Sequence, residues 1–487
     1  MTQNDNEPDT QNDHISERIV VDNEGRVVLR FRWKRLLKVL AILGLAIGSY
    51  FLPLSGLTVD SRLCLMIFVG AAGLWVTEAI PPFATAIMVI VLSIYLLGSP
   101  GGPLTVDTGG VVHNYQIYLN PIASPTLVLF FGGFILAIAA TKHGFDIRLA
   151  KAFLKPFGTH PKMVLLGVIC ITALFSMFMS NTATTAMMIA IVTPLFMHFK
   201  GRDPFRKALV LAIPFAANIG GIGTIIGTPP NAVAASVLGE LGHPISFFSW
   251  MMIGVPLAIV LLFILWVILI KVYKPREDHF EILFPDNLEL TWDLVLVTAT
   301  FVVTVCLWLT EPLHNIPSGV VALIPIMVFS LFHIITRDDL KKVEWNVLIL
   351  IAGGMTLGVA MKSSGLSVVF IKIITALGLS PLVLLIALIV FSIMLSNFMS
   401  NTSAANLLIP IVTSLSFISP VVGAIGVAFA CSFAMSLPIS TPPNAIAFAT
   451  NEVETKDMIK YGSLVSLVGL ILMIGILLVY TVTVGLT

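Results

Sequence analysis

The chain has 487 residues, of which 57% are hydrophobic and only 11% are charged, and its mean hydropathy is +0.99. This composition excludes a water-facing surface over most of the molecule. The net charge of +1 excludes the strong basic field of nucleic-acid-binding proteins. We therefore expect lipid to be the solvent for most of the fold, as in an all-α polytopic membrane protein.

The N-terminal segment, residues 1–35, is polar and rich in Asn and Asp, and it lacks the apolar core of a signal peptide. We expect it to form a disordered cytoplasmic tail. Beyond it, eleven apolar segments are long enough for a helix to cross about 30 Å of hydrocarbon. They begin near residues 37, 62, 82, 125, 207, 250, 292, 317, 345, 421 and 462. The sequence thus predicts eleven transmembrane helices.

Two further apolar segments, residues 163–197 and 382–415, are each interrupted in the middle by a polar tripeptide. The tripeptides are Ser180-Asn181-Thr182 and Ser400-Asn401-Thr402. Each interruption leaves two arms that are too short to span a bilayer separately. Broken apolar segments of this kind occur where a helical hairpin enters the membrane and returns. We therefore predict two re-entrant hairpins with their tips at the tripeptides.

The distribution of Lys and Arg predicts the orientation of the chain, because cytoplasmic loops carry an excess of these residues. On one side of the predicted layout, basic residues gather at 26–38, 148–162, 200–207, 271–276, 337–342 and 456–460. The opposite loops, which contain no Lys or Arg, are residues 99–125, 239–249 and 311–317. Only Lys362 and Lys372 depart from this pattern. We expect a cytoplasmic-membrane protein whose N-terminus is cytoplasmic and whose C-terminus is outside.

Several motifs occur twice in the same order along the chain. The pairs are Trp75-Val76-Thr77-Glu78 with Trp308-Leu309-Thr310-Glu311, Gly132-Gly133 with Gly353-Gly354, the two tripeptides, and Thr228-Pro229-Pro230-Asn231 with Thr441-Pro442-Pro443-Asn444. The offset between copies drifts slowly from 233 to 213 residues, which indicates a duplication with changes in loop length. We predict a first repeat over residues 36–272, including a preceding helix, and a second over 273–487.

The two copies have opposite orientations, because the second span runs inward and its counterpart, the seventh, runs outward. Transporters built from inverted repeats place substrate and ion sites at the repeat interface, in broken helices near the bilayer midplane. A hairpin tip exposes the carbonyl groups of one arm, which suit a hard cation, and the N–H groups of the next, which suit a carboxylate. We therefore interpret the tripeptides as a binding site for a carboxylate and a cation.

The Pro-Pro pairs should interrupt two of the spanning helices, because proline removes backbone donors and forces extended geometry on the preceding residue. A half-helix end would then face each tip and form a polar clamp with it. Ser, Thr and Asn in membrane helices often bond only to neighbouring helices, so one tripeptide alone would favour a structural role. Two copies at matching breaks favour binding.

Glu78 and Glu311 are carboxylates at membrane depth and are therefore proton-relay candidates. Both lie at the end of a span, just before Pro81 and Pro312 respectively. These positions favour interfacial anchoring or packing contacts over proton transfer.

With these motifs, residues 36–487 resemble the divalent anion/sodium symporters, also called INDY-type dicarboxylate transporters. The resemblance implies an elevator-type homodimer with a scaffold domain and a mobile transport domain that carries the hairpins. It implies that the substrate is held by Ser180, Asn181, Thr182, Ser400, Asn401, Thr402, Thr228 and Thr441. It also implies sodium sites formed by Ser176, Ser180, Asn181 and the Gly227 carbonyl, and by Ser396, Asn401 and the carbonyls of Met399 and Ser440. The second Pro-Pro loop departs from the Gly-rich first one, since it carries Ser436, Leu437, Pro438 and Ser440.

A dianion in a low-dielectric site needs compensating charge, and no Arg or Lys lies within the breaks. We therefore predict a transporter, not an enzyme, that couples sodium to the symport of C4 dicarboxylates such as succinate, malate or fumarate. Alternatives that remain open are sodium-independent exchange, proton coupling through Glu78 or Glu311, and transport of citrate, sulfate or 2-oxoglutarate. An intramembrane hydrolase using Ser180 or Ser400 would need a base that is absent nearby in the sequence, and a structural scaffold would bind no ligand.

Overall fold

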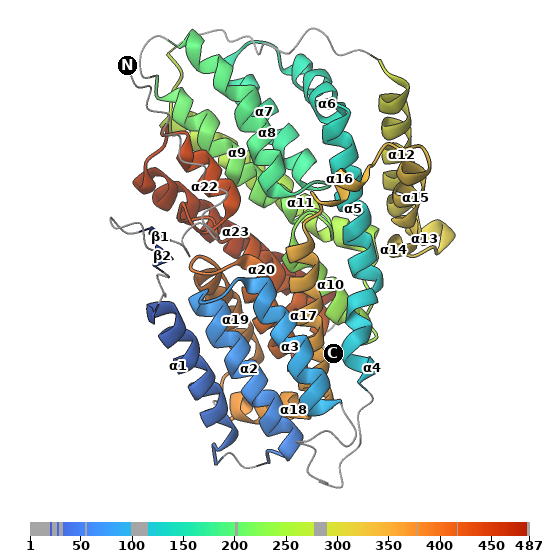
Figure 1. Cartoon of the computed structure of the whole chain (residues 1–487). Helices are drawn as coiled ribbons and strands as arrows, with labels where there is room; N and C mark the ends of the chain where they lie inside the picture. Colours follow the sequence, from blue (N-terminus) through green and yellow to red (C-terminus); the bar gives the residue numbers. More distant parts are fainter. Residues whose placement is uncertain are drawn as a thin grey trace.

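The computed structural model describes residues 20–21, 27–28, 33–53, 56–98, 115–199, 203–276, 290–376, 378–415 and 417–484. Helices form nearly all of this described part (Figure 1). Its only strands are the two-residue pair β1 (Val20–Val21) and β2 (Val27–Val28), which are antiparallel. Most of the predicted N-terminal tail lies outside the described residues. The expectation of an all-α fold is confirmed for the rest.

The first half of the chain contains eleven α-helices and three short 3₁₀ helices within the described residues. These are α1 Trp33–Tyr50, α2 Val59–Thr77, α3 Pro82–Leu97, α4 Gln116–Leu119, η2 Asn120–Ala123, α5 Pro125–Lys142, α6 Phe145–Leu154, η3 Lys155–Phe157, α7 Pro161–Ser176, α8 Asn181–Val192, η4 Thr193–His198, α9 Phe205–Gly221, α10 Pro229–Glu240 and α11 Phe247–Val272. Local signals start several of them. The Ser124 side chain accepts a hydrogen bond from Leu127 N, and Pro125 occupies the first helical position of α5.

The second half repeats much of this order. Its helices are α12 Trp292–Leu309, α13 Glu311–His314, α14 Ser318–Val321, α15 Leu323–Leu331, α16 Arg337–Leu340, α17 Trp345–Ser363, α18 Leu366–Thr375, α19 Pro381–Ser396, α20 Asn401–Ser414, α21 Pro420–Ser432, α22 Pro442–Ala449 and α23 Thr455–Val484. In both halves a helical hairpin (α7–α8, α19–α20) is followed by a helix pair broken before Pro-Pro (α9–α10, α21–α22) and by one long helix. The division into repeats at residues 272 and 273 stays a prediction.

The expected spanning segments all fall on helices, and each predicted start lies within seven residues of a helix start. Within the described residues, six helices are long and apolar enough to cross a membrane: Val59–Thr77, Gln116–Lys142, Phe247–Val272, Trp292–Leu309, Trp345–Ser363 and Thr455–Val479. The chain is therefore a multi-pass membrane protein. The count of eleven spans with two re-entrant hairpins stays a prediction.

Two short helices cross between the halves and bring the breaks together. From the first half, α10 packs against α20 and α21, and from the second half, α22 packs against α8 and α9. Figure 1 shows the hairpin α7–α8 in the upper part of the molecule and α19–α20 in the lower part. This exchange places the loops before α10 and α22 between the two hairpins.

Residues of the repeated motifs have matching structural roles. The buried Trp75 indole donates to the Pro82 carbonyl at 3.0 Å, and the buried Trp308 indole donates to the Ser318 carbonyl at 3.0 Å. The first bond links α2 to α3, and the second links α12 to α14 across the short α13. A methyl group added at Gly132 would lie 2.5 Å from the Ala322 carbonyl oxygen, so this position requires a residue without a side chain.

Charged side chains join the helix ends that the basic residues predict to lie on one side. Lys207, at the start of α9, is 2.8 Å from Asp457 at the start of α23. The Tyr273 hydroxyl, just after α11, donates to the same carboxylate at 3.0 Å. These three helix ends therefore share one face of the molecule. That this face is cytoplasmic stays a prediction.

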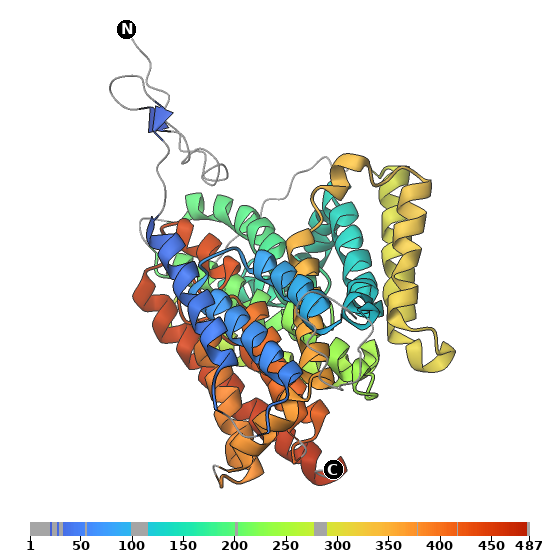
Figure 2. The same ribbon diagram turned by 60° about the horizontal axis from the view of Figure 1, so that its bottom comes forward.

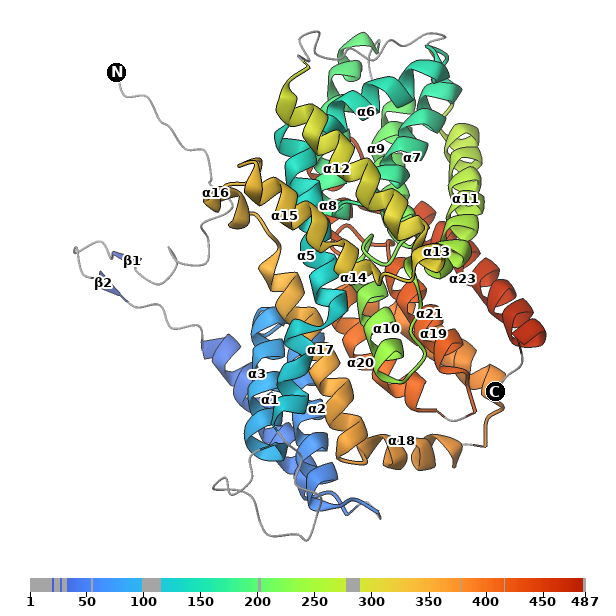
Figure 3. The ribbon, with the colours of Figure 1, turned by 90° about the vertical axis from the view of Figure 1, so that its right-hand side faces the viewer.

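Helices α12 and α15 stand at the periphery, as the view in Figure 2 makes clear. Figure 3 shows that α5 runs beside them toward the centre of the molecule. Many of their apolar side chains are exposed, including Val302, Leu323 and Met327. An apolar exposed surface of this kind requires lipid or another protein as its surroundings.

Candidate functional site

A cavity of about 640 Å³ lies between the two hairpins and the two crossing helices. It is lined by both tripeptides, which we call the first tip (residues 180–182) and the second tip (residues 400–402). All eight predicted substrate residues line it: Ser180, Asn181, Thr182, Thr228, Ser400, Asn401, Thr402 and Thr441. None of the described residues that line it is Lys, Arg or His. The folded chain therefore brings together polar groups from positions more than 200 residues apart.

The first tip is a tight reversal between two helices. Helix α7 ends at Ser176, the backbone of Ser180 is extended, and α8 begins at Asn181. The Ser180 carbonyl accepts from Thr184 N at 2.9 Å, which starts the α8 ladder. The N–H groups before Thr184 have no partner inside the helix, so they remain available to an anion.

The second tip repeats this geometry. Helix α19 ends at Ser396, Ser400 is extended, and α20 begins at Asn401. The Ser400 carbonyl accepts from Ala404 N at 3.0 Å. At neither tip does the serine side chain cap its helix. Both helix N-termini thus keep free donors and the positive end of the helix dipole at the cavity.

The predicted ligands of the first sodium site lie close together. The buried Ser176 hydroxyl contacts the Asn181 amide oxygen and lies 2.7 Å from the Ala217 carbonyl oxygen. A methyl group added at Gly221 would lie 2.9 Å from that amide oxygen and 3.2 Å from the Gly227 carbonyl oxygen. Neutral oxygen atoms from both the tip and the break therefore converge beside Gly221. Such a donor set suits a hard cation.

The second sodium site is predicted from matching residues. The Ser396 hydroxyl donates to the Asn401 amide oxygen at 2.6 Å and lies 3.1 Å from the Cys431 carbonyl oxygen. Met399, Asn401 and Ser440 line the cavity. The Ser440 hydroxyl is directed to the Leu437 carbonyl at 2.8 Å, so its backbone carbonyl is the oxygen that the prediction assigns to sodium.

The asparagine that follows each Pro-Pro pair holds the break loop in place. The Asn231 amide donates to the carbonyls of Gly221 and Thr224 at 3.0 and 2.8 Å. The Asn444 amide donates to the carbonyls of Met435 and Leu437 at 2.8 and 2.9 Å. Both side chains are fully buried. These asparagines shape the loops and leave the preceding Thr228 and Thr441 at the cavity.

Asn218 was missed by the sequence reasoning, although it lines the cavity. Its amide lies 3.3 Å from the Thr441 hydroxyl and 3.4 Å from the Asn444 amide oxygen. Asn218 therefore joins the first half of the chain to the second break. A lone Asn within the apolar α9 was the available signal, since polar side chains at membrane depth usually have a defined partner.

Two carboxylates also line the cavity, Glu78 and Glu344. The Ser400 backbone N–H donates to Glu78 Oε1 at 3.2 Å, and Glu344 lines the same cavity as Ser180. The sequence favoured an anchoring or packing role for Glu78 and Glu311 alike. Glu311 accepts from Phe247 N at 3.1 Å at the start of α11, away from the cavity lining. Glu78, in contrast, lies at the cavity and contacts the second tip, because α20 packs beside α2.

Apart from Asn346, the rest of the cavity wall is mostly apolar. Phe83, Phe130, Phe134, Phe398 and Ile439 are among its lining residues. A largely apolar cavity with a few convergent polar groups is typical of a small-molecule site. Among the described residues, no group of three His, Cys, Asp or Glu side chains lies together to hold a metal ion.

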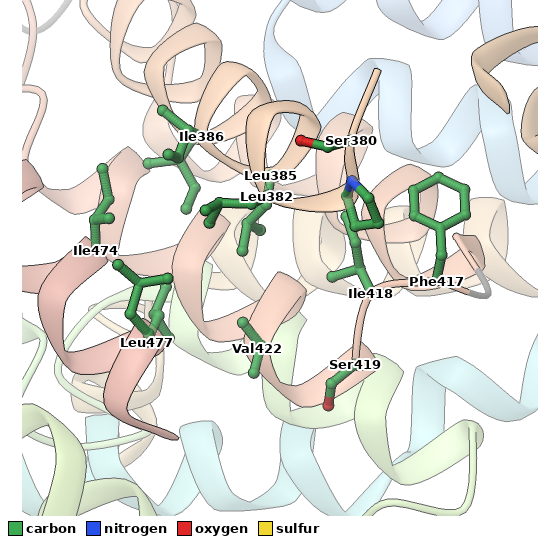
Figure 4. A pocket seen from close by; sticks show the side chains of 13 residues that line it. Ser380, Leu382, Leu385, Ile386, Phe417, Ile418, Ser419, Val422, Ile474 and Leu477 are labelled. Atoms are coloured by element: carbon green, nitrogen blue, oxygen red, sulfur yellow. The ribbon is translucent and has the colours of Figure 1, made fainter. Parts of the chain in front are cut away.

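A second cavity of about 320 Å³ lies between α19, α21 and α23. Its lining is aliphatic and aromatic, as Figure 4 shows for Leu385, Phe417 and Leu477, with the hydroxyls of Ser380 and Ser419 at its edge. No charged residue is among its described lining residues. Burying a dianion there would leave its charge uncompensated, so this cavity does not suit a carboxylate substrate.

Comparison with known proteins agrees with a multi-pass membrane fold. The profile of a family described as "Citrate transporter" matches residues 72–419 and 305–486. The sodium-dependent dicarboxylate transporter SdcS of Staphylococcus saprophyticus is 32% identical over 442 residues, which cover 82% of each chain. SdcS of Staphylococcus aureus is 32% identical over 448 residues, covering 84% of this chain and 83% of the relative.

Two solved structures share the fold at low sequence identity. The YdaH transporter of Alcanivorax borkumensis has a TM-score of 0.56 at 14% identity, covering 82% of this chain and 98% of that one. The antimetabolite efflux pump MtrF of Neisseria gonorrhoeae has a TM-score of 0.52 at 13% identity, covering 81% and 94%. These similarities concern the fold alone. They support the all-α fold of the described residues.

The sequence relatives and the family profile together confirm the resemblance suggested by the doubled motifs, and they identify a transporter and not an enzyme. The ranges matched by the family profile, residues 72–419 and 305–486, include both tips and both breaks. The chain belongs to the divalent anion/sodium symporter family.

Proposed function

We propose that this transporter carries C4 dicarboxylates, such as succinate, malate or fumarate, by sodium-coupled symport across the cytoplasmic membrane. The observation that carries the proposal is a single cavity lined by both tips and by two carboxylates, without a basic side chain among its described lining residues. The names of the sequence relatives, sodium-dependent dicarboxylate transporters, support both the substrate class and sodium as the coupling ion.

The two tips supply matching anion sites for the two ends of a dicarboxylate. Each is the N-terminus of a helix of at least twelve residues, α8 or α20. Backbone N–H groups and the positive end of the helix dipole favour a carboxylate there. The hydroxyl and amide groups of Ser, Asn and Thr add donors without adding a fixed charge. A substrate with a carboxylate at each end can engage both tips at once.

Sodium is required because the cavity carries negative charge before the substrate enters. Two unit charges about 4 Å apart repel by roughly 4 kcal/mol at an effective dielectric constant near 20. That is about half of the 8 kcal/mol that corresponds to micromolar affinity. Glu78 and Glu344 line the cavity, so a dianion needs cations beside it. The neutral oxygens around Gly221 and around Asn401 are the sites we assign to them.

An elevator movement of the hairpins against a scaffold is part of the proposal. Helix α17 packs along α20, whereas its counterpart α5 makes no comparable contact with α8 in the described part of the chain. Inverted repeats that differ in this way are typical of a transporter in one of two alternating states. In the opposite state we expect α5 to approach α8.

A homodimer and the two-repeat domain division are also proposed. The peripheral apolar surface on α12 and α15 (Figure 2) is compatible with a partner subunit as well as with lipid. Light scattering of the purified protein, corrected for detergent, should give twice the 52.5 kDa mass of one chain. A mass near 52.5 kDa would overturn the homodimer.

The decisive experiment measures uptake of labelled succinate into proteoliposomes. An inward sodium gradient should drive accumulation, and replacement of sodium by choline should abolish it. Equal uptake of succinate in choline would overturn the proposed coupling to sodium. Counter-flow without sodium would favour an exchanger, and uptake driven by a pH gradient alone would favour proton coupling. Competition by unlabelled citrate, sulfate and 2-oxoglutarate would rank the substrates.

A further inference from the structure

The cavity contains its own pair of carboxylates, Glu78 and Glu344. Glu78, which directly follows α2, accepts a hydrogen bond from Ser400 N at 3.2 Å. Glu344, which directly precedes α17, lines the same cavity as Ser180 of the first tip. Neither residue belongs to a hairpin or a break. The cavity therefore combines the two tips with two acids from separate parts of the fold, and one of these acids is hydrogen-bonded to a tip.

The contact at the second tip uses a donor that the proposed substrate also needs. Ser400 is the N-cap of the fourteen-residue α20, and its own side chain does not cap the helix. A carboxylate is the favoured partner at such a helix end, whether it comes from a side chain or from a ligand. The Glu78 carboxylate thus lies where a substrate carboxylate would bind.

We propose that Glu78 is a built-in occupant of the second tip, aided at the first tip by Glu344, and that the substrate must displace it in order to bind. This inference rests on the proposed function, because it assumes that the tips receive the substrate carboxylates. It assigns to the two acids a role in setting substrate affinity and selectivity.

The backbone at Glu78 supports a role beyond packing. Its conformation is left-handed, with φ 46° and ψ 34°. A non-glycine residue in this region is uncommon and costs of order 1 kcal/mol or more, so the surrounding structure must hold it there. The same conformation directs the chain from α2 into α3 and leaves the carboxylate at the second tip. Glu311, the counterpart in the second repeat, is instead the first residue of α13.

The charge of Glu78 also has a function when the substrate is absent. Sodium ions in the clamps and two helix N-termini would leave the empty cavity positive, which is costly at low dielectric. Glu78 offsets this charge. Substrate binding then replaces the Glu78 carboxylate with a substrate carboxylate. The measured affinity for the substrate is therefore the difference between the binding of these two carboxylates at the second tip. A dicarboxylate can replace both acids, whereas a monocarboxylate can replace only one, which favours dianions.

The test compares Glu78→Gln with the wild type by isothermal titration of succinate into the purified protein at fixed saturating sodium. The substitution keeps the size of the side chain and removes its charge. We expect the Kd for succinate to fall at least about threefold, which corresponds to roughly 0.65 kcal/mol. We also expect sodium alone to raise the unfolding temperature less in Glu78→Gln than in the wild type.

Glu311→Gln is the matched control, since it changes the same motif and a similar helix-end contact away from the cavity lining. Its Kd for succinate should equal that of the wild type. Glu78→Asp keeps the charge but shortens the reach to Ser400 N, so its Kd for succinate should lie between those of the wild type and Glu78→Gln. It replaces Glu78→Gln as the test variant if Glu78→Gln does not fold.

An unchanged or higher Kd in the folded Glu78 variant would overturn the inference, as would an equal change in Glu311→Gln. If the wild type itself binds no dicarboxylate in sodium, the proposed function fails first. The two failures are therefore distinguishable.

Discussion

The Ser396 hydroxyl lies 2.6 Å from the amide oxygen of Asn401, across the second tip. Ser176 and Asn181 make the same contact across the first tip. In each pair the serine is the last residue of one helix and the asparagine is the first residue of the next. The bond therefore closes the hairpin and holds the amide oxygen beside the proposed cation site.

Ser396→Ala should weaken sodium binding more than it weakens folding. Removal of the hydroxyl frees the Asn401 amide and takes one predicted oxygen ligand from the cation. A neutral hydrogen bond is worth about 0.5–1.5 kcal/mol, so its loss together with the oxygen ligand should raise the sodium concentration for half-maximal succinate binding by up to roughly tenfold. Ser176→Ala should have the same effect at the first site. Titration of succinate binding against sodium measures both.

Residues one turn earlier provide matched controls for these two variants. The Ser392 hydroxyl donates to the Leu388 carbonyl at 2.7 Å, and the Thr172 hydroxyl donates to the Val168 carbonyl at 2.6 Å. Both bonds lie within one helix, so Ser392→Ala and Thr172→Ala should leave the sodium dependence unchanged. An equal loss in the controls would show that packing of the arms, and not ligation, explains the effect.

Gly227→Ala should abolish transport. A methyl group at this position would lie 2.4 Å from the Gly221 carbonyl oxygen, a separation that forces the backbone of the first break to move. The shift would displace the carbonyls that face Asn181.

Gly239→Ala, in the helix that follows the same break, is the matched control. A methyl group added at Gly239 would have no atom within 4 Å. The substitution should preserve uptake and stabilise α10 by up to about 1 kcal/mol. Retained sodium-driven uptake in Gly227→Ala would contradict the assigned site.

Asn444→Ala should lower the unfolding temperature in detergent more than Asn231→Ala does. Each substitution leaves two buried loop carbonyls without their amide donor, at a cost of about 1–3 kcal/mol per group. Asn444 has the additional contact with Asn218. A double-mutant cycle between Asn218 and Asn444 should therefore show coupling of about 0.5–2 kcal/mol. Additive effects would mean that Asn218 does not link the repeats energetically.

Much of this fold could be predicted from the sequence, because its signals are local. Pro-Pro pairs and polar tripeptides break helices wherever they occur, and the breaks lie where the doubled motifs indicate. The second arm of the first hairpin changes its helical form along its length. Helix α8 ends at Val192 and continues as the 3₁₀ helix η4 to His198, because Pro194 lacks the N–H that an α-helical turn requires.

The residues that were missed at the site depend on packing between distant segments. Glu78 and Ser400 are 322 residues apart in the sequence. No spacing rule relates such positions, since their contact follows from how α2 lies against α20. The motif Trp-x-Thr-Glu identified the carboxylate but not its partner. The contacts of Asn218 could not be predicted either, because a single polar residue in an apolar helix does not indicate which neighbouring residue it contacts.

The orientation predicted from loop charges can be tested by cysteine labelling. Leu313, which is 82% exposed between α12 and α14, lies in a loop predicted to be outside. Lys341, just after α16, lies in a loop predicted to be cytoplasmic. A membrane-impermeant maleimide applied to intact cells should label Leu313→Cys and not Lys341→Cys. Both variants need Cys306→Ser as background, because Cys306 is exposed. The reverse labelling pattern would invert the topology.

Asp339→Asn should reduce stability near neutral pH and make it less dependent on pH. The buried carboxylate is 2.6 Å from Lys142 at the end of α5 and caps the backbone of Thr336 at 3.0 Å. Burial alone would raise the pKa of Asp339, but the hydrogen bonds from Lys142, Thr336 and Lys342 outweigh it and hold this pKa well below its usual range. Breaking a buried ion pair costs about 3–5 kcal/mol. Because Lys142 is partly exposed, we expect roughly 2 kcal/mol.

The sign of the pH effect follows from the lowered pKa of Asp339 in the folded protein. Its stabilisation is complete above the pKa of the unfolded carboxyl, about 3.9, and is lost as pH falls toward the folded value. The difference in unfolding temperature between the wild type and Asp339→Asn should therefore be constant from pH 7 to about 5 and shrink below about 4. Asp338→Asn is the control, because Asp338 is exposed and forms its ion pair with the exposed Lys341. It should change stability by less than about 0.5 kcal/mol. A difference between the wild type and Asp339→Asn that persists undiminished at pH 3 would mean that Asp339 stabilises the loop by its shape and not by its charge.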